Sequence, residues 1–178
     1  PYTTLFRSVS YISLFLFLVK KIKRLVKGSR SINFEELKFL QPGISWSPES
    51  DKIVIAAKAG ASDALYLIDV NSDKQEKIAF DLDGVFTASW SPNGEKLAFV
   101  GNEGGASDIY TYEISSKKTT NLTNDVFSDT EPSWSPDGEK IIFVSDRGVI
   151  SNGIKTTAKD MIDHNYEQSD IFIIDLNS

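Results

Sequence analysis

The three tryptophans of the chain, Trp46, Trp90 and Trp134, are spaced 44 residues apart. Each lies in a Ser-Trp-Ser-Pro motif that is followed by a polar turn, a lysine and an apolar stretch. A self-similar period of about 40–45 residues indicates a repeat architecture, in which each copy forms one unit and packs on its neighbours. This repeat constrains the fold more than any other feature of the sequence.

Each copy of the repeat predicts four short β-strands. The first ends at the Trp-Ser pair, after which Pro presets φ and Asn93-Gly94 or Asp137-Gly138 supplies the positive-φ residues of a tight turn. The second strand is expected at 96–100 and 140–145. The third strand is expected at 63–69, 108–114 and 170–175, which are aligned with one another from their first residues. The fourth strand is expected at 76–80 and 119–123. Four antiparallel strands per copy are typical of a propeller blade. We therefore predict an all-β fold, an incomplete β-propeller made of four-stranded antiparallel blades.

The repeat also predicts how the chain is divided. We expect blades at 41–84 and 85–128, a partial blade at 129–178 with an insertion at 149–169, and the end of a preceding blade plus a loop insertion at 9–40. Residues 1–8 resemble a translated sequencing adapter and are interpreted as an artefact. On this interpretation the chain is a fragment cut at both ends, whose bare apolar faces should make it marginally stable and prone to associate.

The apolar run at 9–19 is followed by a basic run at 20–27, and alone it suggests a signal peptide or the end of a membrane span. It is shorter than the roughly 20 residues that cross a bilayer, and a signal peptide carries its positive charge before the apolar run. Laid on the repeat, residues 12–27 match strands three and four of an earlier blade. We prefer that interpretation and predict no membrane span in this chain.

Composition narrows the possible partners. The formal net charge of −6 argues against a nucleic-acid partner, because phosphate binding requires a basic surface. The absence of cysteine excludes disulfides and thiolate chemistry. We expect a globular chain whose partners are proteins or peptides.

Motifs that carry catalysis or bind a metal are missing. The sequence has no Gly-x-Ser-x-Gly elbow and no His-Glu-x-x-His motif, and its single histidine, His164, lies in the predicted insertion, where a solvated loop position is the simplest interpretation. The acidic stretches 69–73 and 160–163 suggest calcium, but the first lacks the Gly and Glu of an EF-hand loop and lies at a predicted hairpin turn. We predict no catalytic, cofactor-binding or metal-binding residues.

The tryptophans could form a ligand platform or pack between blades. Equivalent positions in every copy favour packing, and a buried Trp removes about 150–250 Å² from water, worth at most about 4–6 kcal/mol at about 25 cal/mol per Å². We predict that all three tryptophans are core residues.

The motifs at 134–147, 107–110 and 121–124 resemble the WD40-like repeats of the TolB family, closely over 41–178 and loosely over 12–40. The resemblance implies a non-catalytic propeller scaffold that binds proteins and is periplasmic or otherwise exported. Similar blades also occur as accessory propellers of prolyl-oligopeptidase-like serine hydrolases and of metallopeptidases, which leaves a catalytic domain outside this chain as the alternative. A sugar-binding or sugar-hydrolysing propeller is a weaker third possibility, because no paired carboxylates distinguish one copy. The insertion at 149–169 is the first candidate for a specific contact, and the insertion at 29–39 is the second.

Overall fold

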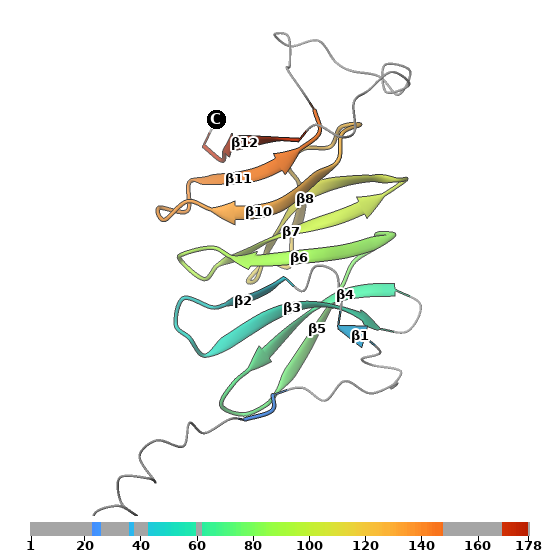
Figure 1. Cartoon of the computed structure of the whole chain (residues 1–178). Helices are drawn as coiled ribbons and strands as arrows, with labels where there is room; N and C mark the ends of the chain where they lie inside the picture. The colour runs from blue at the N-terminus through green and yellow to red at the C-terminus, as the bar shows by residue number, and fades with distance from the viewer. Residues whose placement is uncertain (1–22, 26–35, 38–42, 60–61, 148–168, 178) are drawn as a thin grey trace, which may run out of the picture.

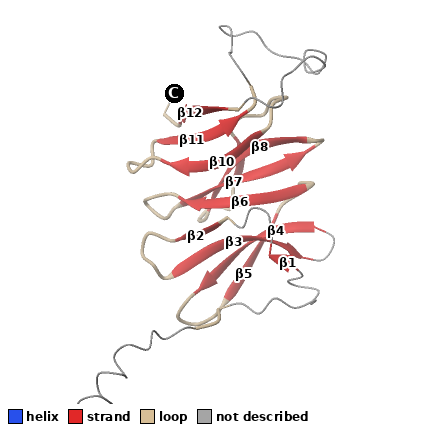
Figure 2. Ribbon diagram, in the orientation of Figure 1, coloured by secondary structure: helices blue, strands red, loops and turns tan. Residues whose placement is uncertain are grey.

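The computed structural model describes residues 23–25, 36–37, 43–59, 62–147 and 169–177. Every regular element in these residues is a β-strand, and the strands form three antiparallel sheets (Figure 2). The sheets are stacked in chain order, the first at the bottom and the third at the top of Figure 1. The all-β prediction is confirmed.

The strands of the described residues follow the predicted blade pattern. The first sheet contains β1 (Glu36–Leu37), β2 (Ile44–Trp46), β3 (Lys52–Ala59), β4 (Ser62–Asp69) and β5 (Gln75–Ala79), in the order β1-β3-β4-β5 with β2 also paired to β3. The second sheet has the order β6 (Gly84–Trp90), β7 (Lys96–Glu103), β8 (Ala106–Glu113), β9 (Thr119–Asn121). The third sheet has the order β10 (Asp129–Trp134), β11 (Lys140–Ser145), β12 (Asp170–Asp175).

Strand register shows that the predicted alignment of the third strands was one residue off in the first sheet. Lys52 pairs with Asp69 as Lys96 pairs with Glu113, so the 44-residue period holds along the whole hairpin. This period places Ala64, and not Asp63, at the position of Asp108. The prediction had placed Asp63 at the position of Asp108, but register is set by the turn and the alternation of buried side chains.

The first strands of the second and third sheets are bent at equivalent positions. Thr87 and Glu131 both have positive φ, and each lies where the register of its hairpin shifts, as in a β-bulge. Gly43 is the corresponding residue of the first sheet, and a Cβ atom there would lie 2.3 Å from the Thr87 Cα. Only glycine allows the two strands to approach so closely at this point.

Apolar side chains on alternating residues give each sheet two packing faces, a leading face toward the preceding sheet and a trailing face toward the following one. The trailing face of the first sheet packs on the leading face of the second in a cluster that includes Val54, Leu65, Trp90, Leu97 and Phe99. The trailing face of the second sheet packs in the same way on the third, through Ala98, Val100, Ile109, Ile141 and Phe143.

The prediction that all three tryptophans are buried is wrong for Trp46. Trp90 is 9% exposed and Trp134 is partly buried, with its indole N–H donating to the Ser89 carbonyl over 3.2 Å. Trp46 is 55% exposed. Trp90 and Trp134 each pack on the sheet before their own, whereas in the described residues no sheet precedes β2.

Several predictions fall at the edge of the described residues or outside them. Residues 1–22 lie outside, as does the insertion predicted at 149–169 except for its last residue. The strand predicted for 22–27 is not formed at residues 23–25, although Leu25 packs against the leading face of the first sheet. The short strand β1 falls within the predicted loop at 29–39. We find no helix in the described part of the chain that is long and apolar enough to span a membrane.

Candidate functional site

The most elaborate arrangement of charged side chains lies at the end of the third sheet, where the chain leaves β11. Arg147 follows β11, Asp125 and Asp129 belong to the connection from β9 to β10 and to the first residue of β10, and Asp108 lies in β8. We call these four residues the Arg147 cluster. It joins the second sheet to the third at the point from which the sequence enters the predicted insertion.

Arg147 is held on several sides. One terminal nitrogen, Nη2, donates to both carboxylate oxygens of Asp129 over 2.7 and 2.6 Å, and Nη1 lies 3.2 Å from Asp125. Its Nε donates to the Ser145 hydroxyl over 2.8 Å. The Arg147 side chain is 11% exposed and Asp129 is fully buried, so this is a buried ion pair and not a surface one.

Three aromatic rings surround the same guanidinium group. Its central carbon lies 5.7, 5.0 and 5.3 Å from the ring centroids of Phe127, Phe143 and Phe172. A cation near the face of an aromatic ring is attracted to it, and this cation–π attraction is stronger where water is excluded. The rings come from the β9–β10 connection, from β11 and from β12, so the guanidinium group ties together three segments.

Asp108 organises the connection on the other side of the cluster. Its carboxylate accepts hydrogen bonds from the Thr123 hydroxyl over 2.9 Å and from the Asn121 amide over 2.8 Å. The Asp125 backbone N–H lies 3.4 Å from the same carboxylate. Asp146, next to Arg147, accepts from the Ser128 backbone N–H over 2.8 Å. The connection between the sheets is therefore fixed at both of its ends by carboxylates.

Asp125 is a member of the cluster whose charged form is disfavoured in the folded chain. Burial raises the pKa of its carboxyl group above the ordinary 3.8, and the carboxylates of Asp129 and Asp108 act in the same direction. A hydrogen bond from the Phe127 backbone N–H and the charge of Arg147 oppose this rise in pKa. The pKa is raised overall, so burial outweighs the attraction of the Arg147 guanidinium group.

Carboxylate oxygens of Asp108, Asp125 and Asp129 lie within 4.8 Å of one another, a spacing that could hold a cation. Oxygen ligands of this kind suit Ca²⁺ or Mg²⁺. Arg147, however, already bonds two of the three carboxylates and supplies the positive charge that a cation would bring. The chemistry of the cluster is that of an internal ion pair, and the absence of metal-binding residues stays a prediction.

The sequence prediction missed this cluster, although a signal for it was present. Position 129 corresponds to Val85 one repeat earlier, and position 147 corresponds to Glu103. From the second copy to the third, Val85 is thus replaced by Asp129, and Glu103 is replaced by Arg147. Paired changes at two positions of one repeat indicate a contact between them.

The acidic stretch at 69–73 forms the predicted turn. The Asp69 carboxylate accepts hydrogen bonds from the backbone N–H groups of Asn71 and Ser72 over 3.0 and 2.8 Å. The bonds from Ser72 are the main cause that lowers the pKa of Asp69 below 3.8. This is an Asx turn, as predicted. The other stretch, 160–163, and His164 lie outside the described residues.

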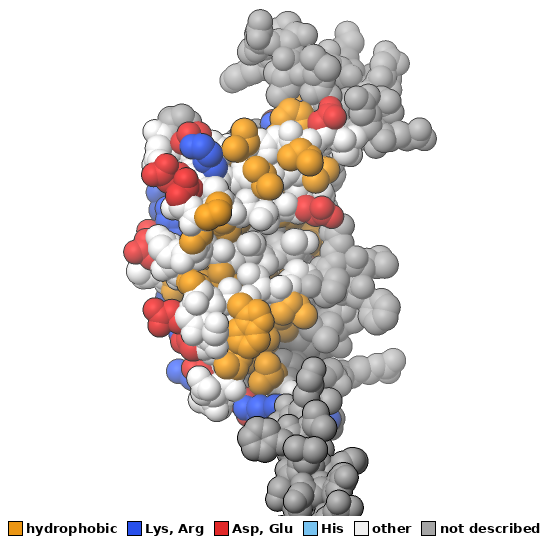
Figure 3. Space-filling view, turned by 60° about the vertical axis from the view of Figure 1, so that its left-hand side comes forward, with side chains coloured by type: hydrophobic (Ala, Val, Ile, Leu, Met, Phe, Trp, Pro, Cys, Tyr) orange, Lys and Arg blue, Asp and Glu red, His pale blue; other side chains and the backbone are white. Residues whose placement is uncertain are grey.

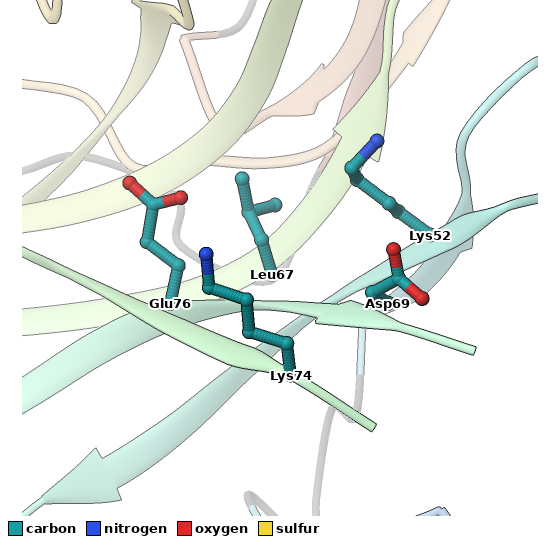
Figure 4. A pocket seen from close by; sticks show the side chains of 5 residues that line it. All are labelled: Lys52, Leu67, Asp69, Lys74 and Glu76. Atoms are coloured by element: carbon teal, nitrogen blue, oxygen red, sulfur yellow. The ribbon is translucent and has the colours of Figure 1, made fainter. Parts of the chain in front are cut away.

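A cavity of about 180 Å³ lies on the first sheet, away from the Arg147 cluster. Figure 4 shows its five lining side chains, which come from β3, β4, β5 and the turn before β5: Lys52, Leu67, Asp69, Lys74 and Glu76. Two cations and two carboxylates balance one another there, and Lys52 is already bonded to Asp51 over 2.6 Å. The hydrogen bond to Asp51 raises the pKa of Lys52, and the hydrogen bonds from Ser72 lower the pKa of Asp69, so both groups stay charged at neutral pH.

Stacked antiparallel sheets with one 44-residue repeat per sheet, of which the second has four strands, define part of a β-propeller. Residues 28–156 match the family model described as the TolB beta propeller domain. The chain therefore belongs to the TolB β-propeller family. No curated protein sequence matches the chain.

Solved structures show a similar fold. TolB from Acinetobacter baumannii is 32% identical, with a TM-score of 0.53 over 60% of this chain and 27% of that protein. The putative TolB from Agrobacterium tumefaciens is 22% identical, with a TM-score of 0.54 over 60% of this chain and 39% of that protein. The tricorn protease is 16% identical, with a TM-score of 0.56 over 75% of this chain and 13% of that protein. The last two show the fold alone, and the chain spans less than half of each of these structures.

Proposed function

We propose that this chain is part of a non-catalytic β-propeller scaffold that binds other proteins at the end of the propeller where the Arg147 cluster lies. The observation that carries the proposal is the buried ion pair between Arg147 and Asp129 at this end. A loop that binds a partner must be positioned by a rigid scaffold. Arg147 and Asp129 supply such a base at the start of the insertion at 149–169.

The chemistry of the described residues supports binding more than catalysis. They contain no histidine or cysteine, and the carboxylates of the Arg147 cluster are already engaged by a guanidinium group or by hydrogen bonds. The family relationship favours a periplasmic or otherwise exported protein whose partners are envelope proteins. The net charge of −6 favours protein partners over nucleic acid.

A second candidate is an accessory propeller that admits or docks peptides for a peptidase domain elsewhere in a longer protein. The observation that favours it is the structural likeness to part of a protein named as a protease, the tricorn protease. That likeness concerns the fold alone. The candidate predicts a Gly-x-Ser-x-Gly or His-Glu-x-x-His motif in the same open reading frame.

Deletion of residues 150–168 tests the scaffold proposal. We expect the immobilised chain to retain a specific protein from an envelope extract, and the shortened chain to lose that protein while keeping its β-sheet circular dichroism. A variant at the opposite end, Asn71→Ala, should retain the protein and serves as the control. Equal retention by all three chains would remove the insertion from the proposal, and retention by none would contradict the scaffold itself.

A further inference from the structure

The turn between β6 and β7 contains the dipeptide Asn93-Gly94, in which Asn93 is exposed. Asparagine is chemically labile because the backbone nitrogen of the next residue can attack its side-chain amide, and a glycine, which has no side chain, hinders this attack least. The turn lies on the left-hand side of Figure 1. Figure 3 brings that side forward and shows acidic and basic side chains along its edge. The turn is thus open to water, which deamidation of an asparagine consumes.

Hydrogen bonds hold both residues of the dipeptide in the folded turn. The Gly94 backbone N–H donates to the Ser91 carbonyl over 2.9 Å. The Asn93 amide oxygen accepts from the Ser91 hydroxyl over 2.7 Å and from the Glu95 backbone N–H over 3.1 Å. The Asn93 amide nitrogen donates to the Glu95 carboxylate over 2.8 Å. The amide and the nitrogen that would attack it are therefore both engaged.

Deamidation would break this arrangement. The Gly94 nitrogen forms a bond to the side-chain carbonyl carbon of Asn93 and loses its proton, while the amide nitrogen takes up a proton and leaves as ammonia. Water then opens the resulting cyclic imide at either of its two carbonyl groups, which gives aspartate or isoaspartate. The imide has no N–H on residue 94, so it cannot form the hydrogen bond to the Ser91 carbonyl. The hydrogen-bonded turn therefore disfavours the intermediate.

The third repeat shows how the same turn accommodates an aspartate. Asp137 occupies the equivalent position between β10 and β11, and its carboxylate accepts from the Ser135 hydroxyl and, over 3.0 Å, from the Glu139 backbone N–H. The Gly138 N–H donates to the Ser135 carbonyl over 2.9 Å. The φ angles of Gly94 and Gly138 are 74° and 75°. The two turns thus have the same bonds and the same glycine conformation, with an amide in one and a carboxylate in the other.

We propose that Asn93 is a deamidation site controlled by the turn: the folded turn protects the amide, and the reaction proceeds when the hairpin of β6 and β7 opens. Aspartate formed at this position fits the turn, as Asp137 does, and adds a negative charge to an exposed surface. Isoaspartate carries the main chain through the side-chain carboxyl group, which lengthens the turn by a methylene group and prevents the original hydrogen bonds. Deamidation therefore yields one product that restores the hairpin and one that distorts it.

Among the described residues this dipeptide occurs only here. The other asparagines of the described residues that precede another described residue are followed by residues with side chains, which hinder the attack: Asn71-Ser72, Asn102-Glu103, Asn121-Leu122 and Asn124-Asp125. The same dipeptide recurs at Asn152-Gly153, outside the described residues. Tryptic cleavage at Lys96 and Arg147 separates the two sites, so peptide mapping measures each one by itself.

Two serine variants test the proposal. Ser91→Ala removes the hydroxyl that donates to the Asn93 amide and accepts from the Lys96 backbone N–H over 2.9 Å. Ser135→Ala removes the same two bonds from the equivalent turn and is the matched control. Each chain is incubated at neutral pH, folded or in guanidinium chloride, and mass spectrometry of tryptic peptides follows the conversion at Asn93. Circular dichroism establishes which samples are folded.

We expect the folded wild type and Ser135→Ala to react at Asn93 at one slow rate, at least about tenfold below the rate in guanidinium chloride. Folded Ser91→Ala should react roughly tenfold faster than the folded wild type, because its turn has lost two hydrogen bonds and opens more often. In guanidinium chloride the three chains should react equally fast. No conversion in guanidinium chloride would overturn the site itself. Equal folded and denatured rates, or equal folded rates for Ser91→Ala and Ser135→Ala, would overturn control by this turn.

A second measurement does not depend on the serine variants. Asn93→Asp, which carries the aspartate product, should keep the β-sheet circular dichroism and the midpoint of urea unfolding of the wild type. A clearly lower midpoint would show that the turn does not accommodate the aspartate, and would overturn that part of the proposal.

Discussion

Trp90 and Trp46 occupy the same position of the repeat, yet Trp90 is 9% exposed and Trp46 is 55% exposed. Their own hairpins are alike, since Trp90 pairs with Leu97 as Trp46 pairs with Ile53. The two residues differ only in what lies across from them. The first sheet covers Trp90, and no described sheet covers Trp46.

This comparison separates what a repeat encodes from what its neighbours supply. The strand, the turn and the direction of the side chain are local properties, and they recur with each copy. Burial is a property of the contact between two copies, so it depends on the presence of the next one. The same distinction applies to the charged positions of the repeat, and substitutions at equivalent positions can test it.

The tryptophan pair gives the largest expected difference. Trp90→Ala should lower the free energy of unfolding by about 3–5 kcal/mol, the usual cost of removing a buried aromatic side chain. Trp46→Ala should lower it by less than about 1 kcal/mol, because that side chain is largely exposed in the monomer. Urea unfolding at low protein concentration measures both values. Equal losses would mean that the repeat position, and not the neighbouring sheet, determines the contribution.

Arg147 and Glu103 form the second pair, one repeat apart. Arg147→Ala should cost about 3 kcal/mol, because it leaves the buried Asp129 carboxylate without its partner. Arg147→Lys should recover only part of this loss, since an ammonium group cannot bond both Asp129 oxygens and Asp125 as the planar guanidinium does. Glu103→Ala, at an exposed position, should change stability by less than about 0.5 kcal/mol.

Thermal and urea unfolding of the three variants would measure these differences. A small effect of Arg147→Ala would show that Asp129 is protonated or solvated without the arginine. In that case the Arg147 cluster could not serve as the rigid base of the insertion, and the proposed binding end would lose its main support.

The local features of this fold could be predicted from the sequence because they depend on residues close together in the chain. The 44-residue spacing located the hairpins, and Pro with Asn-Gly or Asp-Gly located the turns after Trp90 and Trp134. The Asx turn at Asp69 follows from the same short-range chemistry, in which a carboxylate bonds backbone N–H groups two and three residues later.

Features that depend on distant residues could not be predicted in the same way. The exposure of Trp46 depends on a sheet outside its own repeat. The one-residue error at Asp63 arose because the strands were aligned on an aspartate, whereas the register follows the pairing of the whole hairpin. The Arg147 cluster brings together residues up to 39 positions apart, and only the joint change at positions 129 and 147 marked it.

Asp125 and Asp81 form the third pair, with the smallest expected effect. Asp125 is partly buried beside Asp129 and Asp108, whereas Asp81 is exposed. Because the pKa of Asp125 is raised in the folded chain, the folded state binds its proton more tightly than the unfolded state does. Asp125 therefore contributes stability below about pH 3.8, and this contribution is lost as the pH rises through the higher folded-state pKa.

Asp125→Asn removes this ionisation while retaining an oxygen that can accept the Phe127 N–H bond. At neutral pH we expect the variant to be more stable than the wild type, and the advantage to shrink as acidification protonates Asp125 in the wild type. Asp81→Asn should leave stability unchanged at both pH values. Urea unfolding at pH 7 and at pH 4 measures the comparison. If Asp125→Asn were less stable at pH 7, the attraction of Arg147 would outweigh burial, and the Arg147 cluster would be held together by all of its carboxylates in their charged form.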